Sequence, residues 1–223
     1  MHHKGSSHIA RSAPPVWRNE LPKIVNHDQR RLELVDATWR IIAQHGIEGA
    51  TMREIAAEAG FANGALKPYF PTKDSLITFA FGHVFNRTNQ RIAERTAGKV
   101  GIEALHGFCQ EVLPLDEDRI NEARIVIPFW QKALTDATKT ELHESSMHQW
   151  RAGLQVHLRQ ARSRGEVTVP IKDEDIINQL MCILLGAQII AAMSPGEHLP
   201  AQLNAQLDAY LLLLDPAHAI ESR

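Results

Sequence analysis

A short helix with a strong start signal is the feature that most restricts how this chain can fold. Thr51 and Glu54 have the spacing of a capping box, in which each side chain hydrogen-bonds the other residue's backbone N–H in the first turn of a helix. Gly60 ends the pattern after about two turns. Between them, small and apolar residues recur with helical spacing: Met52, Ile55, Ala56 and Ala59. A second short helix is expected over residues 63–70, and the pair predicts a helix-turn-helix unit, whose second helix enters the DNA major groove.

The rest of the chain carries helical patterns. Apolar spacing predicts a helix from Asp28 to a stop at Gly46, and Thr72 is placed to cap a long helix after the unit. Five more helices are expected, over residues 102–113, 117–135, 137–164, 173–194 and 200–214. The predicted fold class is therefore all-α. Three parts are predicted: a flexible N-terminal arm at residues 1–27, a three-helix helix-turn-helix head at residues 28–75 and an all-helical body at residues 76–223.

Charge and cysteine content restrict the class of protein further. Residues 1–74 carry ten basic and eight acidic side chains, and residues 75–223 carry fourteen basic and eighteen acidic ones. This small excess of positive charge in the head is weak evidence, so the prediction of DNA binding depends on the helix-turn-helix pattern. Cys109 and Cys182 lie 73 positions apart without a C-x-x-C motif, which argues against a disulfide framework or a cysteine zinc site. The most apolar stretch, residues 180–193, spans only 14 positions. We expect a soluble, cytoplasmic protein without a membrane partner.

The sequence around the unit resembles a known family. Residues 49–76, GATMREIAAEAGFANGALKPYFPTKDSL, resemble the DNA-binding head of the tetracycline-repressor (TetR) family, and the match covers about 48 residues from Arg30. The resemblance implies a homodimeric, all-helical regulator, usually a repressor, that a small-molecule effector releases from a DNA operator. Residues 76–223 would then be the ligand-binding and dimerisation domain. The body's length and helix pattern resemble the subgroup named after the choline-responsive regulator of betaine synthesis.

Two departures from the family pattern affect the recognition helix. Ala62 stands where the family commonly has Ser or Thr, so Asn63 is expected to supply the helix cap. Lys67 replaces a common Tyr, and the following Pro68 lacks an N–H and biases Lys67 away from helical angles. The DNA-binding candidates are Thr51, Arg53 and Lys73 at phosphates, and Asn63, Gly64, Ala65, Lys67 and Tyr69 at the major groove and backbone. Leu66 and Phe70 are expected in the core.

A ligand cavity is expected between the helices of the body, lined by apolar side chains with a few polar groups. Pro128 should kink its helix beside Trp130. A mainly apolar or aromatic effector is expected, although each candidate also fits a plain core position. The candidate ligand-binding residues are Phe81, Phe85, Phe108, Ile127, Trp130, Met147, Trp150, Cys182 and Gln188.

A palindromic operator requires a protein with twofold symmetry. The helices over residues 173–194 and 200–214 are the expected dimer interface, because the first is apolar nearly all round, and with their mates they would form a four-helix bundle. The alternative is that they only fill the core of one protomer. The interface candidates are Ile183, Gly186, Ile190, Leu203, Leu207, Tyr210, Leu211 and Leu214.

Other function classes fit the sequence less well. Three histidines of one predicted helix are spaced five and nine apart, unlike the i, i+4 pair that places two metal ligands on one helix face. No motif of a metalloprotease, P-loop or serine hydrolase occurs. We therefore expect no catalytic residues, no metal and no cofactor. An architectural DNA-binding protein without an effector is the alternative to a regulator, and the arm residues Arg11, Arg18 and Lys23 either reach the DNA or form an unengaged tail.

Overall fold

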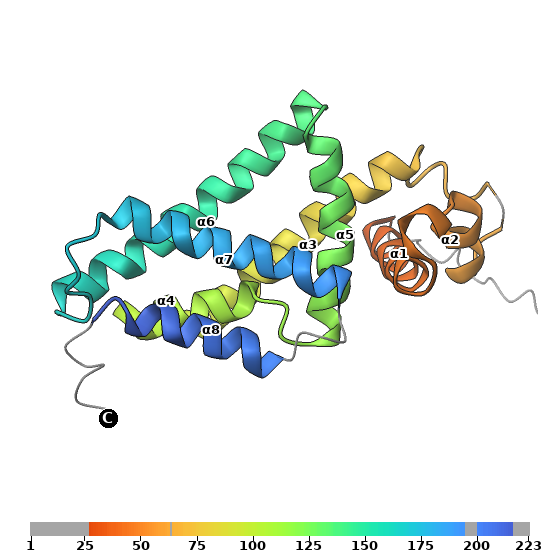
Figure 1. The fold of residues 1–223 in the computed structure, drawn as a ribbon. Coiled ribbons are helices and arrows are strands. Elements are labelled where there is room, and N and C mark those ends of the chain that lie inside the picture. Colours follow the sequence, from red (N-terminus) through yellow and green to blue (C-terminus); the bar gives the residue numbers. More distant parts are fainter. Residues whose placement is uncertain (1–26, 63, 195–199, 216–223) are drawn as a thin grey trace, which may run out of the picture.

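Eight helices make up the described part of the chain, as a small head at one end of a larger body (Figure 1). The computed structural model describes residues 27–62, 64–194 and 200–215, and no strand occurs in these ranges, so the all-α prediction is confirmed. The predicted arm lies outside the described residues except for His27, which begins the first helix. The helices are α1 (His27–Gly49), α2 (Met52–Glu58), α3 (Lys73–Thr96), α4 (Gly101–Val112), α5 (Glu117–Ala133), α6 (Ala137–Ser163), α7 (Asp173–Met193) and α8 (Pro200–Leu212).

The head packs α1, α2 and the start of α3 around one apolar core. The predicted capping box forms: the Thr51 hydroxyl accepts the Glu54 N–H at 3.2 Å, and the Glu54 carboxylate accepts the Thr51 N–H at 3.1 Å. Gly60 follows α2 with a φ of 72°, which glycine adopts without steric cost. Gly46, the predicted stop of the first helix, interrupts α1 with non-helical angles, and α1 resumes as far as Gly49. Large buried side chains fill the space between these helices: Leu34, Ile55, Phe70 and Leu76.

The second helix of the predicted helix-turn-helix unit is not an α-helix in the structure. Residues 64–69 form successive turns, and the Tyr69 N–H donates to the Leu66 carbonyl, three residues back, at 2.9 Å. Pro68 has no N–H to donate and disfavours helical angles in the residue before it. Gly64 has a φ of 86°, which lies in the left-handed region. The prediction of a regular second helix is therefore wrong.

Helices α3 and α5 connect the head to the body. α3 begins in the head at a capping box of Thr72 and runs for 24 residues into the body, so the predicted domain boundary falls inside its first turn. α5 packs against both α3 and α1 (Figure 1), although Pro128 removes one of its helix hydrogen bonds. Phe81 of α3 and Phe129 of α5 stack with ring centroids 3.8 Å apart in the head core. The head and the body therefore share this pair of helices.

The body packs α4, α6, α7 and α8 around a second core. By length and composition alone, α7 is long and apolar enough to cross a membrane, a test that core helices of soluble proteins also pass. In the structure one face of α7 packs into the body core through Leu180 and Leu184. Ile189 and Ile190 are exposed. α7 therefore combines a core-forming face with an exposed apolar surface.

Candidate functional site

The first group of predicted DNA-binding residues lies at the start of α2, at the far end of the head from the body (Figure 1). Arg53 is exposed, and no ion pair within the described ranges involves it. The exposed Thr51 hydroxyl also donates to the Glu54 carboxylate at 2.7 Å. This hydrogen bond lowers the pKa of Glu54, which favours its charged form at the positive end of the helix dipole. Arg53 is therefore available for a phosphate, whereas Thr51 acts first as a helix cap.

The turns after α2 carry the second group. Lys67 and Gly64 are exposed and Ala65 is half-buried, while Asn63 lies outside the described residues. A Cβ built on Gly64 meets no atom within 4 Å, so another molecule can approach the backbone closely here. Leu66 and Phe70 are buried, as the core prediction required.

Tyr69 and Lys73 are partly engaged inside the head. The Tyr69 ring lies 4.5 Å from the His27 ring and edge-on to Phe61 at 5.8 Å. The Lys73 ammonium donates to the carbonyl of Ile47, near the end of α1. Lys73 keeps two further N–H groups, so its contact with phosphate stays a prediction.

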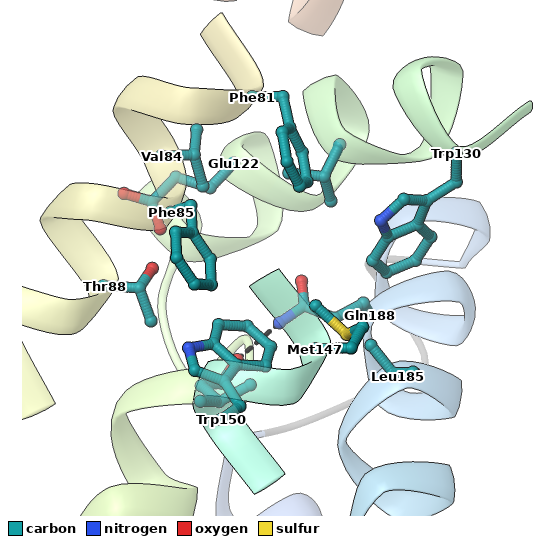
Figure 2. A pocket seen from close by; sticks show the side chains of 12 residues that line it. Phe81, Val84, Phe85, Thr88, Glu122, Trp130, Met147, Trp150, Leu185 and Gln188 are labelled. Atoms are coloured by element: carbon teal, nitrogen blue, oxygen red, sulfur yellow. Dashed lines mark hydrogen bonds between the residues drawn. The ribbon is translucent and has the colours of Figure 1, made fainter. Parts of the chain in front are cut away.

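A cavity of about 30 Å³ lies inside the body, between α3, α5, α6 and α7 (Figure 2). Its walls are mainly aromatic and aliphatic. The lining residues are Phe81, Val84, Phe85, Thr88, Val112, Glu122, Val126, Trp130, Met147, Trp150, Leu185 and Gln188. Six of the candidates named from the sequence are among them: Phe81, Phe85, Trp130, Met147, Trp150 and Gln188. The structure brings these six together; that they bind a ligand stays a prediction.

Three other candidates do not line the cavity. Phe108 is buried in the body core, where its ring packs so closely on Gly153 that a Cβ there would lie 2.8 Å from it. Cys182 is exposed on α7. Ile127 follows Val126 on α5, and the turn of about 100° per residue takes its side chain off the lining face. Their assignment to the cavity is therefore wrong.

Glu122 is a buried charge in the cavity wall. Both of its oxygens bind the Arg91 guanidinium, with N···O distances of 3.0 and 2.9 Å, and Arg87 lies 3.9 Å away. Arg91 also donates to the Thr88 hydroxyl at 3.1 Å. Burial by itself would lower the pKa of Arg91, but hydrogen bonding to Glu122 and the attraction of nearby carboxylates outweigh it, so this pKa is raised. The Glu122 charge is therefore already compensated by the protein.

Three other polar groups of the wall differ in their hydrogen bonding. The Trp150 Nε1–H donates to the Asn89 side-chain oxygen at 2.9 Å. The Gln188 amide nitrogen donates to the Val112 carbonyl, and its oxygen points into the cavity (Figure 2). The Trp130 Nε1–H is buried and has no hydrogen-bond partner in the described structure. Figure 2 shows this nitrogen on the edge of the indole that faces the cavity.

The predicted interface residues of α8 and its C-terminal turn lie inside one protomer. They form a single stripe that packs into the body core, in part against α4. The Tyr210 hydroxyl is also used within the protomer, as it donates to the Ile176 carbonyl at 3.4 Å. A side chain buried in its own protomer has no surface left for a partner, so the assignment of the four buried residues to the interface is wrong, whereas Tyr210 is half-buried and its place at an interface stays a prediction. The four buried residues are Leu203, Leu207, Leu211 and Leu214.

The predicted interface residues of α7 have a different position. Ile183 and Gly186 are half-buried, and Ile190 is 46% exposed. Met193, one turn further, is 77% exposed. Spacings of three and four residues place these side chains on one face of α7. We call this set the α7 stripe.

Six residues of the cavity wall were not predicted from the sequence, although helical spacing from predicted wall residues would have indicated most of them. Val84 and Thr88 follow Phe81 by three and seven residues, so they share its helix face. Glu122 and Val126 precede Trp130 by eight and four residues. The other two missed residues are Val112 and Leu185.

Comparison with known proteins identifies the family. Residues 34–78 match the family described as bacterial regulatory proteins, tetR family. Residues 101–215, more than half of the chain, match the family of the BetI-type transcriptional repressor, C-terminal. The chain belongs to the TetR family. TetR-family proteins are DNA-binding transcriptional regulators and not enzymes, and typical members are repressors that respond to a ligand.

Individual relatives of this TetR-family regulator are also named as transcriptional regulators. The HTH-type transcriptional regulator PksA of Bacillus subtilis (strain 168) is 36% identical over 110 residues, which is 49% of this chain and 54% of that protein. BetI of Burkholderia ambifaria (strain MC40-6) is 24% identical over 153 residues, 66% of this chain and 76% of that protein. The match to PksA thus spans only about half of that regulator.

Solved structures share the fold. A transcriptional regulator from Rhodococcus sp. Rha1 has a TM-score of 0.71 at 28% identity, covering 82% of this chain and 95% of that chain. A regulator from Saccharomonospora viridis, solved in complex with choline, has a TM-score of 0.74 at 17% identity, covering 82% and 96%. The second likeness shows the fold alone.

Proposed function

We propose that this regulator is a homodimeric repressor in the cytoplasm that leaves a palindromic operator when a small apolar or aromatic effector occupies the cavity. The observation that carries the proposal is the double position of Phe81. Its ring lines the cavity, and it also stacks on Phe129 in the head core. An effector that displaces the Phe81 ring would therefore disturb its stack on Phe129, which is a contact between α3 and α5, the helices that connect the cavity to the head.

The cavity has to widen to accept an effector. Its volume of about 30 Å³ is far below that of sites for drug-sized ligands, which span roughly 300–1,000 Å³. Effector binding therefore favours a state in which the wall helices lie further apart. The shift is limited by the effector's differential affinity for the two states, and a coupling of about 1–3 kcal/mol corresponds to a loss of operator affinity of about 5- to 150-fold.

The wall favours an uncharged effector. The neighbour from Saccharomonospora viridis binds choline, and aromatic side chains like those of this cavity can bind such a cation through their ring faces. In this chain, however, a cation would have to compete with Arg91 for the only carboxylate of the wall, Glu122. We therefore propose a neutral effector, and choline belongs in the ligand screen as the cationic comparison.

We propose that Arg53 and Lys67 are the main side chains at the DNA, because both are exposed at the outer end of the head. Arg53 would bind a phosphate near the start of α2, and Lys67 would bind a phosphate or the guanine edge in the major groove. The open space beside Gly64 would let the backbone of these turns approach the DNA closely. The remaining proposed contacts are Thr51, Asn63, Ala65, Tyr69 and Lys73.

We propose that the α7 stripe forms the centre of the dimer interface. A Cβ built on Gly186 meets no atom of its own protomer within 4 Å, so Gly186→Arg should leave the protomer folded and separate the dimer. Val156→Arg, at a 54% exposed apolar site on α6, is the matched control and should stay dimeric. Sedimentation velocity measures both variants. A dimeric Gly186→Arg protein would place the interface elsewhere.

A gel-shift assay with DNA from upstream of the protein's own gene tests the regulatory function. The wild-type protein should bind this DNA, reject a scrambled fragment of equal composition and release the DNA when an effector from a thermal-shift screen is added. Equal affinity for both fragments would support an architectural DNA-binding protein instead. Loss of DNA binding in Arg53→Ala, with an unchanged melting temperature, would assign the contact to the head.

A further inference from the structure

We infer that the effector carries an uncharged oxygen, in a carbonyl or hydroxyl group, that accepts a hydrogen bond from the Nε1–H of Trp130. The inference rests on the proposed function, because it describes the ligand of the same cavity. It makes Trp130 the residue that determines which of several similarly shaped molecules the regulator detects.

Two tryptophans line the cavity, and they differ in one respect. The Trp150 Nε1–H donates to Asn89 at 2.9 Å. The Trp130 Nε1–H is buried from water but has no partner within the described ranges, and it faces the cavity (Figure 2). Buried indole N–H groups usually have a hydrogen-bond partner, because an unsatisfied donor loses its interaction with water. An acceptor inside the cavity would satisfy this donor.

The surroundings of Trp130 decide what kind of acceptor fits. The His143 ring lies edge-on to the indole, 6.1 Å between ring centroids, and makes no hydrogen bond to it. The Gln188 oxygen points into the same cavity and is itself an acceptor (Figure 2). A hydroxyl group can accept from Trp130 and donate to Gln188, and a carbonyl can accept from Trp130.

Charge excludes a carboxylate as this acceptor. The wall already contains the carboxylate of Glu122, whose cationic partner Arg91 is bound to it through two hydrogen bonds. A second carboxylate in the cavity would be buried without a cation of its own and repelled by Glu122. An uncharged oxygen avoids both costs.

A pair of probes of the same shape tests the inference: acetophenone has a carbonyl oxygen where α-methylstyrene has a CH₂ group. The full-length protein, with nitrogen-15 in its tryptophans, is titrated with each probe and the indole N–H resonances are followed by NMR. We expect acetophenone to bind about tenfold more tightly than α-methylstyrene, as for one added hydrogen bond, and to move the Trp130 resonance downfield. In Trp130→Phe the two affinities should become equal.

The control is Trp39→Phe in the head, which removes a buried N–H that also lacks a partner among the described residues but does not line the cavity, so the tenfold preference should persist. The inference fails if α-methylstyrene binds the wild-type protein as tightly as acetophenone, or if the preference survives in Trp130→Phe or is lost equally in Trp39→Phe. If Trp130→Phe does not fold, the test is the shift of the Trp130 resonance when acetophenone is added to the wild-type protein. If neither probe moves the Trp130 or Trp150 resonance at millimolar concentration, the effector cavity itself is refuted, and the inference falls with it.

Discussion

The bidentate ion pair between Arg91 and Glu122 allows a quantitative prediction. The Glu122 side chain is only 6% exposed and both of its oxygens are bound by Arg91. Arg91→Met would leave the carboxylate buried without this partner, a loss that typically costs about 3–5 kcal/mol of unfolding free energy. Arg87 stays 3.9 Å from the carboxylate and compensates part of the charge, so we expect about 3 kcal/mol. The matched control is Arg95→Met, one turn along α3. The Arg95 side chain is exposed and, among the described residues, its guanidinium hydrogen-bonds only Gln110, so its loss should cost less than about 0.5 kcal/mol.

The double variant Arg91→Met/Glu122→Met separates the charge from the packing. Replacing both members of a buried pair by apolar side chains of similar volume is often neutral or stabilising, so the double variant should unfold within about 1 kcal/mol of the wild-type protein. Urea unfolding followed by circular dichroism measures all four proteins, at one protein concentration because dimerisation adds to apparent stability. The reasoning is refuted if Arg91→Met loses less than about 1 kcal/mol, or if the double variant is less stable than the single one.

Three further predictions concern other sites. Lys67→Ala should weaken operator binding and reduce by about one the slope of the logarithm of the binding constant against the logarithm of the salt concentration. Gel shifts at several salt concentrations measure this slope, and Lys172→Ala, far from the head, should leave it unchanged. Burial raises the pKa of the Cys109 thiol to about 12, so a thiol reagent at neutral pH should label only Cys182 in the folded protein, and labelling of both would contradict the buried position. Burial lowers the pKa of His143, against the opposing attraction of Glu144, so the folded protein binds fewer protons at this side chain than the unfolded protein does. The free energy of unfolding should therefore fall as the pH decreases through about 6.5. In urea titrations His143→Gln should lose less unfolding free energy than the wild-type protein between about pH 7.5 and 5.5, and an identical loss would contradict the lowered pKa.

The helix positions were predictable because their signals are local. A cap such as Thr51 or Thr72 acts on residues three positions away, and an apolar stripe repeats within one helix. Pro68 was an equally local signal against a regular second helix, and it outweighed the family pattern. The all-α fold and the cavity's position between α3 and α5 therefore follow largely from sequence spacing.

The features that could not be predicted depend on contacts between residues far apart in the sequence. The stripe from Leu203 to Leu214 has the spacing of an interface, but periodicity shows only that a stripe is buried, not whether its own protomer or a second copy buries it. Glu122 meets Arg91 across 31 positions, and no local pattern pairs them. Within the described residues the Trp130 N–H has no hydrogen-bond partner, and this follows from how the helices of the cavity wall pack.

The length of α3 has a mechanical consequence. Its 24 residues span about 36 Å at 1.5 Å per residue, from the Thr72 cap in the head to the far side of the body. If the helix tilts by about 5° about its body end, its head end moves by about 3 Å, close to the rise of about 3.4 Å between base pairs. At Phe85, halfway along, the same tilt needs a wall displacement of only about 1.6 Å. Under the proposed mechanism, a wall displacement of this size at Phe85 would thus shift a head by nearly one base-pair step.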